Sequence, residues 1–308
     1  MKKIFIIHEN EEWIKPLVAE LKNTNASFEK WHMNEVCIDM SLPPPDGIFY
    51  NRMSASSHSR GHRYAPEYTA AVLNWLEFYN KRVINNSSAL ALEISKSLQY
   101  KELKKAGINI PKTQFTSDKN QLLKLGKIFP LPFLTKHNRA GRGLGIKLFH
   151  DYYNFEQYVE SDDFEESIDG ITLLQEYIIT KTEVITRAEF IDSKFIYAVQ
   201  VDTSNGFQLC PADACNLEDE YCPANATGNK FMILENFSNP ILDKFQKVLK
   251  NNHIEIAGIE FLQDNSGKLY SYDINTNTNY NSIAENLYEL KGMKTIADFL
   301  IRELDKLN

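Results

Sequence analysis

One loop of the sequence combines alternate glycines with basic side chains, a composition that could hold phosphate. Between two apolar runs, the segment FLTKHNRAGRGLGIKLF (133–149) contains Lys136, Arg139, Gly141, Arg142, Gly143 and Gly145. Glycine lets backbone N–H groups approach phosphate oxygens closely. The spacing matches neither a dinucleotide fingerprint, which opens a helix, nor a P-loop, which ends in Gly-Lys-Ser/Thr. Two hypotheses remain: a phosphate-binding turn between antiparallel strands, able to close as a lid, or a surface hairpin without a ligand.

A second segment carries oxygen ligands within strands that are otherwise apolar. In AGIEFLQDNSGKLYSYDIN (257–275), we expect a hairpin with Glu260 on its first strand and Asp273 and Asn275 on its second. Residues two apart share one face of a strand, and Glu260 can lie across the turn on that face. Carboxylate and amide oxygens suit Mg²⁺. The alternative is a polar, solvent-facing surface, but the apolar neighbours favour a metal site.

A third segment is rich in basic residues and follows an expected strand. YNRMSASSHSRGHRYAPEY (50–68) contains Arg52, His58, Arg60, His62 and Arg63. Open α/β sheets bind ligands at the carboxyl ends of their strands, so this segment could hold an anionic substrate such as an amino-acid or peptide carboxylate. A solvated basic loop is the alternative.

The first part of the chain alternates short apolar strands with helices. We expect strands at 3–8, within 42–53 and at 82–86, separated by helices at 11–23 and 65–80. This alternation is typical of a parallel α/β sheet.

The rest of the chain mixes helices with antiparallel strands. A single long helix is expected at 88–107, ending at Gly107. The remaining expected elements are helices near 118–126, 154–161, 239–252 and 293–307, strands at 171–178, 184–191 and 194–202, and the two hairpins already described. A polar loop of about thirty residues after the last of these strands contains Cys210, Cys215 and Cys222. Their spacing lacks the paired C-x-x-C of zinc sites, so we expect free thiols.

The overall composition is that of an ordinary soluble globular protein. The chain has 308 residues, of which 43% are hydrophobic and 24% charged, with a formal net charge of −7. This balance gives no basic face for nucleic acid. The apolar run at the start is too short for a signal sequence, and no run is long enough to cross a membrane. We therefore expect a cytoplasmic protein of two or three subdomains, without nucleic-acid or membrane partners.

Four blocks, taken in order, resemble the ATP-grasp superfamily and specifically its RimK-like and glutathione-synthetase-like carboxylate–amine ligases. SKSLQYKELKKAGINIPKT resembles a helix in which a lysine lies eleven residues before a glycine, and counting back from Gly107 gives Lys96. The glycine loop resembles the strand, lysine and loop that cover ATP. LLQEYI resembles the hinge that holds adenine, and GIEF…YDIN resembles the metal-binding hairpin.

The resemblance covers residues 88 to about 290 and implies an α/β (α+β) ATP-grasp fold. An N-terminal parallel α/β domain (1–87) would precede a central subdomain with the glycine-rich lid hairpin (88–174). A C-terminal subdomain with the metal-binding hairpin (175–308) would complete a clasp around ATP.

The resemblance also implies roles for single residues. Those expected to bind ATP are Lys96, Lys136, Arg139, Gly141, Arg142, Gly143, Gly145, Gln175, Glu176, Tyr177, Ile178 and Glu183. Arg187, together with Lys136, would act on the transferred phosphate. Glu260, Asp273 and Asn275 would hold two Mg²⁺ ions, with Mn²⁺ as an alternative.

The implied reaction is an ATP-dependent ligation through an acyl phosphate, in which a peptide or small-molecule carboxylate joins an amine. Two other functions stay open: a kinase that phosphorylates a hydroxyl, and a non-catalytic nucleotide-binding partner protein. Homodimers are common in this class. One departure concerns the run NTNTNYNS, which lacks the Pro-Gly that relatives carry after the metal-binding asparagine. Asn277 and Asn279 could bind substrate in its place, together with Arg52, Arg60, His62 and Arg63.

Overall fold

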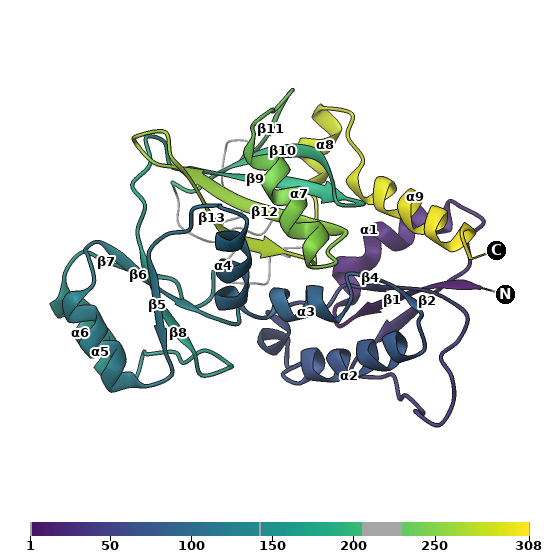
Figure 1. Cartoon of the computed structure of the whole chain (residues 1–308), viewed down its shortest axis with the longest axis horizontal. Helices are drawn as coiled ribbons and strands as arrows, with labels where there is room; N and C mark the ends of the chain where they lie inside the picture. The colour runs from purple at the N-terminus through teal and green to yellow at the C-terminus, as the bar shows by residue number, and fades with distance from the viewer. Residues whose placement is uncertain (1, 142, 205–229, 308) are drawn as a thin grey trace.

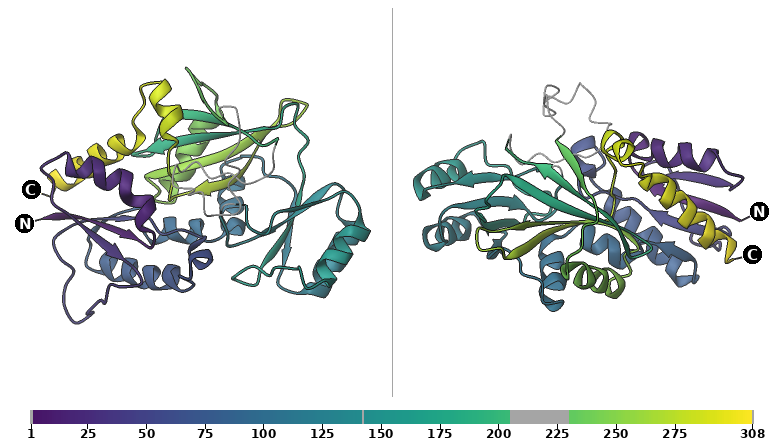
Figure 2. Two further views of the ribbon diagram at one scale, coloured as in Figure 1. Left: turned by 180° about the vertical axis from the view of Figure 1, so that it is seen from behind. Right: turned by 90° about the horizontal axis from the view of Figure 1, so that it is seen from above.

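The computed structural model describes residues 2–141, 143–204 and 230–307. Three β-sheets lie in a row, the C-terminal sheet between the other two, and both ends of the chain lie at one end of the molecule (Figures 1 and 2). The loop with Cys210, Cys215 and Cys222 falls outside the described residues, as does Arg142. The predicted fold class, a parallel α/β unit followed by two mixed α/β units, is confirmed.

The N-terminal sheet is parallel and has helices on both faces. Across the sheet its strands are β2 (Phe28–His32), β1 (Lys3–His8), β3 (Gly47–Asn51) and β4 (Arg82–Ile84). Ile4 and Ile6 lie on the face of the sheet that helix α1 (Glu11–Lys22) covers. Phe5 and Ile7 lie on the opposite face, which helix α2 (Ala65–Phe78) covers. Apolar residues at successive positions of β1 are buried because both faces are covered.

Strand β2 was not predicted, and the expectation of three strands in this sheet is wrong. In its sequence FEKWH only Trp31 is buried, because β2 lies at the edge of the sheet. An edge strand of this composition lacks the apolar run by which the other strands were recognised.

The expected single helix at 88–107 is also wrong, because the chain breaks it into α3 (Ser87–Glu93) and α4 (Lys96–Lys105). Ser95 has extended backbone angles (φ −148°, ψ 103°), and its side chain caps α4 by accepting a hydrogen bond from the Leu98 amide. Lys96 is therefore the first residue of a helix, with its own amide donating to the Asn138 carbonyl at 3.1 Å.

The central sheet is antiparallel and has two helices packed against it. Its strands are β5 (Thr113–Thr116), β8 (Thr172–Glu176), β6 (Phe133–His137) and β7 (Lys147–Phe149), and its helices are α5 (Lys119–Ile128) and α6 (Tyr152–Glu160). Phe133, Phe149 and Phe155 form its core. The predicted hairpin around the glycine loop is confirmed, since Phe133 pairs with Phe149 and Thr135 with Lys147.

The C-terminal sheet is antiparallel and supports the second hairpin. Its strands are β11 (Phe231–Leu234), β10 (Lys194–Asp202), β9 (Val184–Ile191), β12 (Ile256–Gln263) and β13 (Leu269–Asn275). Helix α7 (Ile241–Asn251) packs with α3 and α4 on one face around Phe190 and Phe245. Strand β11 and the short helix α8 (Ser282–Leu287) were not predicted.

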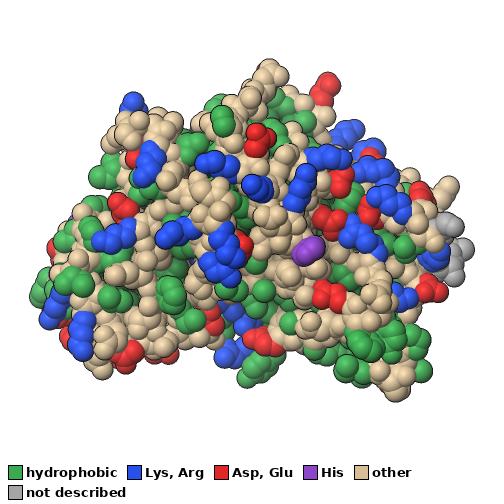
Figure 3. Space-filling view, in the orientation of Figure 1, with side chains coloured by type: hydrophobic (Ala, Val, Ile, Leu, Met, Phe, Trp, Pro, Cys, Tyr) green, Lys and Arg blue, Asp and Glu red, His purple; other side chains and the backbone are tan. Residues whose placement is uncertain are grey.

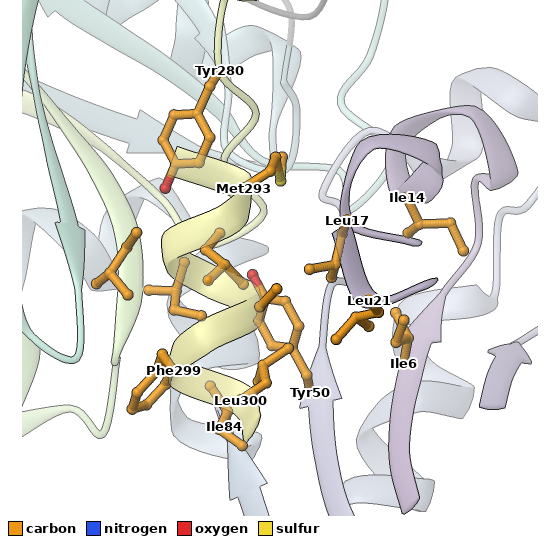
Figure 4. Close-up of a cluster of buried hydrophobic side chains, with 14 of the residues drawn as sticks. Ile6, Ile14, Leu17, Leu21, Tyr50, Ile84, Tyr280, Met293, Phe299 and Leu300 are labelled. Carbon is orange, nitrogen blue, oxygen red and sulfur yellow. The ribbon is translucent and has the colours of Figure 1, made fainter. Parts of the chain in front are cut away.

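The last helix, α9 (Gly292–Asp305), joins the N-terminal and C-terminal sheets. Its apolar side belongs to one buried cluster with Ile6 and Tyr50 of the first sheet and residues such as Ile256 of the last (Figure 4). Arg82 of β4 adds ion pairs to Glu255 and to Glu303, the second at 2.7 Å. The two ends of the chain thus share one hydrophobic core.

None of the described helices has the length and apolar character needed to span a bilayer. On the face drawn in Figure 3, acidic and basic side chains are interspersed.

Removing a side chain from this shared core should destabilise the whole protein. Phe299 in α9 is 1% exposed, so Phe299→Ala should lower the free energy of unfolding by about 3–5 kcal/mol through lost burial and a residual cavity. Phe78→Ala, at a site 77% exposed, is the matched control and should change it by less than about 0.5 kcal/mol. Urea titration measures both, and equal losses in the two variants would contradict the described packing.

Candidate active site

A cleft lies between the central and C-terminal sheets, where the two predicted hairpins face each other. It encloses about 1100 Å³, including the part open to solvent. Of the predicted site residues, those lining it are Lys96, Lys136, Gly141, Gly143, Gln175, Glu176, Tyr177, Ile178, Glu260, Asp273 and Asn275. Residues up to 179 positions apart in the chain, from Lys96 to Asn275, therefore meet in one concave site.

Two lysines are buried in this cleft, and only one of them has a carboxylate partner in the part of the chain that the structure describes. Lys96 donates to Asp273 Oδ1 at 2.5 Å. Lys136 is 5% exposed and lies over the Tyr272 ring, 4.9 Å from its centroid. Among residues 2–141, 143–204 and 230–307, no carboxylate oxygen is within 4 Å of its ammonium group. Burial, and then the nearby Lys96 charge, lower the pKa of Lys136 to about 7. A buried cation of this kind is stabilised by an anionic ligand such as phosphate.

The acidic hairpin has the predicted register. Glu260 pairs with Asp273 across β12 and β13, and Gly258 pairs with Asn275. Burial and the neighbouring Asp273 raise the pKa of Glu260 to about 7. Burial alone would raise the pKa of Asp273 too, but Lys96 and Lys136 hold it below its usual range.

The donor set of this hairpin suits a divalent cation. Asn275 Oδ1 is buried and has no hydrogen-bond partner in the described structure. Two carboxylates that disfavour each other's charge, beside an orphaned amide oxygen, match the oxygen ligands of Mg²⁺. The described residues hold no group of three His, Cys, Asp or Glu side chains suited to a metal.

Arg187 lies on the same face of the C-terminal sheet, directly across from Glu260 in register. It is 3% exposed, with Nε 2.6 Å from Glu189 Oε1 and Nη1 3.7 Å from Glu260 Oε1. Burial opposes its charge, yet these two carboxylates keep its pKa above the usual value. A Cβ atom at Gly258 would lie 2.3 Å from Arg187 Nε, so the absence of a side chain there makes room for the guanidinium.

The predicted hinge segment 175–178 comprises the last two residues of strand β8 and the two that follow, and all four line the cleft. Gln175 Oε1 accepts a hydrogen bond from the Tyr100 hydroxyl at 2.5 Å. Glu176 Oε2 accepts from the Lys112 amide at 3.1 Å, and the Tyr177 amide donates to the Pro132 carbonyl at 3.2 Å. Apolar side chains beside the hinge, among them Ile185 and Leu262, complete this end of the cleft. Such a lining suits a planar base.

Three predicted nucleotide-binding residues are not among those that line the cleft in the described structure: Arg139, Gly145 and Glu183. Arg139 Nη1 pairs with Glu67 Oε1 of α2 at 2.5 Å and so ties the glycine loop to the N-terminal unit. Gly145 packs against the His137 ring, and its carbonyl accepts from Thr135. The Glu183 carbonyl accepts from the Thr203 amide at 2.8 Å.

The basic segment after β3 is partly neutralised within the protein. Glu9, 1% exposed, accepts from Arg60 Nη2 at 2.5 Å and lies 2.9 Å from His62 Nδ1. Arg63 donates to the Ile168 carbonyl at 3.2 Å. Arg52 is 2% exposed and contacts the other residues proposed for substrate, with Nε donating to Asn277 Oδ1 at 3.0 Å and Nη2 to Asn279 Oδ1 at 2.8 Å.

Sequence reasoning missed several residues that complete the site. Tyr272 lies beneath Lys136, Glu189 orients Arg187, and Gly258 makes room for it. The spacing of Arg187 and Glu189, two residues apart on one strand face, is a signal that could have identified Glu189. Thr278, which contacts both Arg187 and Glu189, had no such signal.

Comparison with solved structures agrees with this architecture. The ligase PsnB in complex with a minimal precursor, Mg and ADP shares 14% identity, with a TM-score of 0.64 and coverage of 98% of this chain and 97% of that one. A RimK-domain ATP-grasp protein from Sphaerobacter thermophilus shares 13%, with a TM-score of 0.65 and coverage of 96% and 98%. A ligase from Chryseobacterium gregarium, in complex with ADP and a leader and core peptide, shares 17%, with a TM-score of 0.63 and coverage of 98% and 97%.

The chain therefore has the ATP-grasp fold over almost its whole length, and the resemblance seen in the four sequence blocks is confirmed at that level. No protein-family model matches the sequence, and no curated protein matches it significantly.

Filling the space beside Arg187 should be unfavourable only while the arginine is present. Gly258→Ala should lower the free energy of unfolding by about 1–3 kcal/mol, because the new methyl group overlaps the buried guanidinium. In an Arg187→Ala background the same change should cost less than about 0.5 kcal/mol. Urea unfolding of the single and double variants measures the coupling. Equal costs in both backgrounds would show that Gly258 does not serve to accommodate Arg187.

His8, at the carboxyl end of β1, should make stability depend on pH. It is 1% exposed, neither ring nitrogen has a hydrogen-bond partner among the described residues, and burial lowers its pKa to about 4. The unfolded chain takes up a proton below about pH 6.5 whereas the folded one does not, so stability is full above that pH and is lost as the pH falls toward 4.

Between pH 6.5 and 5 the wild type should therefore lose about 2 kcal/mol more than His8→Leu, which has no ionisable group at this site. Unfolding titrations of both proteins at these two pH values measure the difference. Parallel losses in the two proteins would show that His8 is not buried in its neutral form.

Proposed function

We propose that this protein is an ATP-dependent carboxylate–amine ligase that forms an amide bond through an acyl phosphate. The observation that carries the proposal is Lys136, a buried cation with no carboxylate partner among the described residues, which faces an acidic hairpin across one cleft. A buried site that contains both positive and negative groups suits the phosphates of a nucleotide bound together with a metal ion.

In this proposal the adenine lies against the hinge 175–178 and the apolar side chains of Ile185 and Leu262. The phosphates lie toward Lys96, Lys136 and the backbone amides of Gly141 and Gly143. ADP bound to the ligase from Chryseobacterium gregarium supports a nucleotide at this kind of fold. Arg139, Arg142 and Gly145 belong to the proposal as residues of the glycine hairpin that would approach ATP when it closes, and Glu183 as an acceptor of hydrogen bonds from the ribose hydroxyls.

Glu260, Asp273 and Asn275 would hold Mg²⁺, and the Mg in the PsnB complex supports this choice. When bound, the ion supplies positive charge to the phosphate oxygens as negative charge develops on them. Lys96 shields the pair of carboxylates and keeps Asp273 ionised, which is the form that ligates a cation. The number of ions, and Mn²⁺ as a substitute, belong to the proposal as well.

The proposed chemistry uses Arg187, which lies opposite Glu260 on the neighbouring strand. A substrate carboxylate oxygen attacks the γ-phosphorus of ATP, the bond to the bridging oxygen breaks, and ADP leaves. Lys136 and Arg187 stabilise the charge on the transferred group. An amine then attacks the acyl carbon, phosphate leaves, and the amine loses a proton. Closure of the glycine hairpin would exclude water that could otherwise hydrolyse the acyl phosphate.

The substrate is proposed to be an amino-acid or peptide carboxylate. The leader and core peptide bound to the ligase from Chryseobacterium gregarium supports a peptide. In this chain Arg60 and His62, held by Glu9, and the exposed Arg63 lie after β3 at the carboxyl edge of the parallel sheet. Partly exposed basic groups at that edge suit an anionic substrate.

The test is ADP release from ATP and Mg²⁺ with pooled amino acids and short peptides supplied as carboxylate and amine. Release should require both a carboxylate and an amine. Lys136→Ala should lower it by about 10²–10³-fold, since a cation that stabilises the transferred phosphate is lost. Lys147→Ala on β7 of the same hairpin is the matched control and should leave release unchanged, because Lys147 is exposed and lies over Tyr158.

A stable phosphorylated product formed without an amine would instead identify a kinase. Tight ATP binding without any release would rule out the ligase.

A further inference from the structure

Arg52 is a buried cation whose guanidinium binds a loop that is far away in the sequence, and its Nη1 also lies 3.9 Å from Met293 Sδ. It follows β3, is 2% exposed, and has no carboxylate within 4 Å among the residues that the structure describes. Its guanidinium donates from Nε to Asn277 Oδ1 at 3.0 Å and from Nη2 to the Thr278 carbonyl at 2.9 Å and Asn279 Oδ1 at 2.8 Å. The planar guanidinium group of Arg52 therefore holds three consecutive residues in place.

Thr278 connects this guanidinium group to Arg187. Its carbonyl accepts from Arg52, and its hydroxyl accepts a hydrogen bond from Arg187 Nη2 and donates to Glu189 Oε2 at 2.8 Å. Thr278 is fully buried. A shift of its backbone would move the hydroxyl with it, because both belong to one residue with a restricted side-chain rotamer. The two guanidinium groups are thus coupled through a single residue.

The same loop begins at a proposed metal ligand and is held at that end by other groups. After Asn275, the Thr276 amide and hydroxyl donate to Glu93 Oε2, and the Thr276 carbonyl accepts from Asn85. Arg52 fixes the next three residues. Its removal would therefore release the part of the loop that contacts Arg187 and leave the end next to the metal hairpin anchored.

We propose that Arg52 is a positioning residue, which holds the guanidinium of Arg187 in place through Thr278. The inference rests on the proposed function, in which Arg187 stabilises the transferred phosphate. Arg52 itself is not among the residues that line the cleft. Substituting it should therefore slow turnover and leave nucleotide binding intact, because none of the described residues proposed to bind ATP forms a hydrogen bond with it.

Two variants break the coupling from opposite ends, and a third serves as a control. Arg52→Lys keeps the charge but loses the planar guanidinium group, and Thr278→Val keeps the shape but loses the hydroxyl. Arg82→Lys alters another arginine that ties the N-terminal sheet to the last part of the chain, through Glu255 and Glu303, without contacting the loop 276–280. Arg82→Lys therefore tests whether weaker contacts between these two parts of the chain are enough to change the Arg187 signal or turnover.

The first measurement is the NMR signal of the Arg187 Nε–H group, assigned by its absence in Arg187→Lys. This signal should shift or broaden in Arg52→Lys and Thr278→Val and stay unchanged in Arg82→Lys. The second is steady-state ADP release, where the first two variants should lower kcat by about 10–100-fold with the KM for ATP changed by less than about threefold. Arg82→Lys should preserve kcat.

The proposal is overturned if Arg52→Lys and Thr278→Val leave the Arg187 signal or kcat at the wild-type value, or if Arg82→Lys changes both to the same extent. A wild type that releases no ADP would refute the proposed ligase, whereas the NMR comparison would still decide whether Arg52 positions Arg187.

Discussion

The burial of opposite charges in and beside one cleft is the constraint on which the rest of the structure depends. Lys96, Lys136, Arg187 and Glu260 are each at most 7% exposed, and Asp273 lies among them. Charges removed from water are tolerated only where partners and geometry compensate for lost hydration. Here the compensation is incomplete, since Lys136 has no close carboxylate in the described structure and Glu260 has a raised pKa. An incompletely compensated site of this kind is suited to a ligand that brings its own charges.

Holding such groups together requires stiff supports, and the two antiparallel sheets supply them. Arg187, Glu260 and Asp273 project from neighbouring strands at paired register positions, so backbone hydrogen bonds set their spacing. Lys136 comes from a strand of the other sheet, and Lys96 comes from the first turn of α4. The site therefore depends on how the central and C-terminal sheets face each other, and the chain passes from one to the other between β8 and β9.

The N-terminal unit contributes through a polar seam at the carboxyl edge of its parallel sheet. Asn85, fully buried, donates to the carbonyls of Ile256 and Thr276, and Arg52 holds the three residues that follow Thr276. These hydrogen bonds hold the two units in a fixed relative position, because buried polar groups are costly to leave unpaired. The hydrophobic cluster around α9 includes Met293, whose sulfur lies 3.9 Å from Arg52 Nη1. Stability and the placement of Arg187 are consequently linked in the same region.

Much of this could be read from the sequence because it is encoded locally. Period-two alternation and turn residues identified both hairpins, and a carboxylate two positions from an amide indicated one face of one strand, which is why Glu260, Asp273 and Asn275 were recognised together. Elements whose residues carry a weak local pattern were missed, such as the edge strand β2 and the break in the helix before Lys96. The ion pair of Arg139 with Glu67 and the contacts of Arg52 with residues 225 to 227 positions away depend on how whole sheets pack, and no local periodicity records that. The sequence by itself determined which strands and charged side chains exist, because backbone geometry and side-chain spacing are local. Only the tertiary structure decided which charges meet and which are neutralised within the chain, because those contacts arise when distant segments are packed against one another.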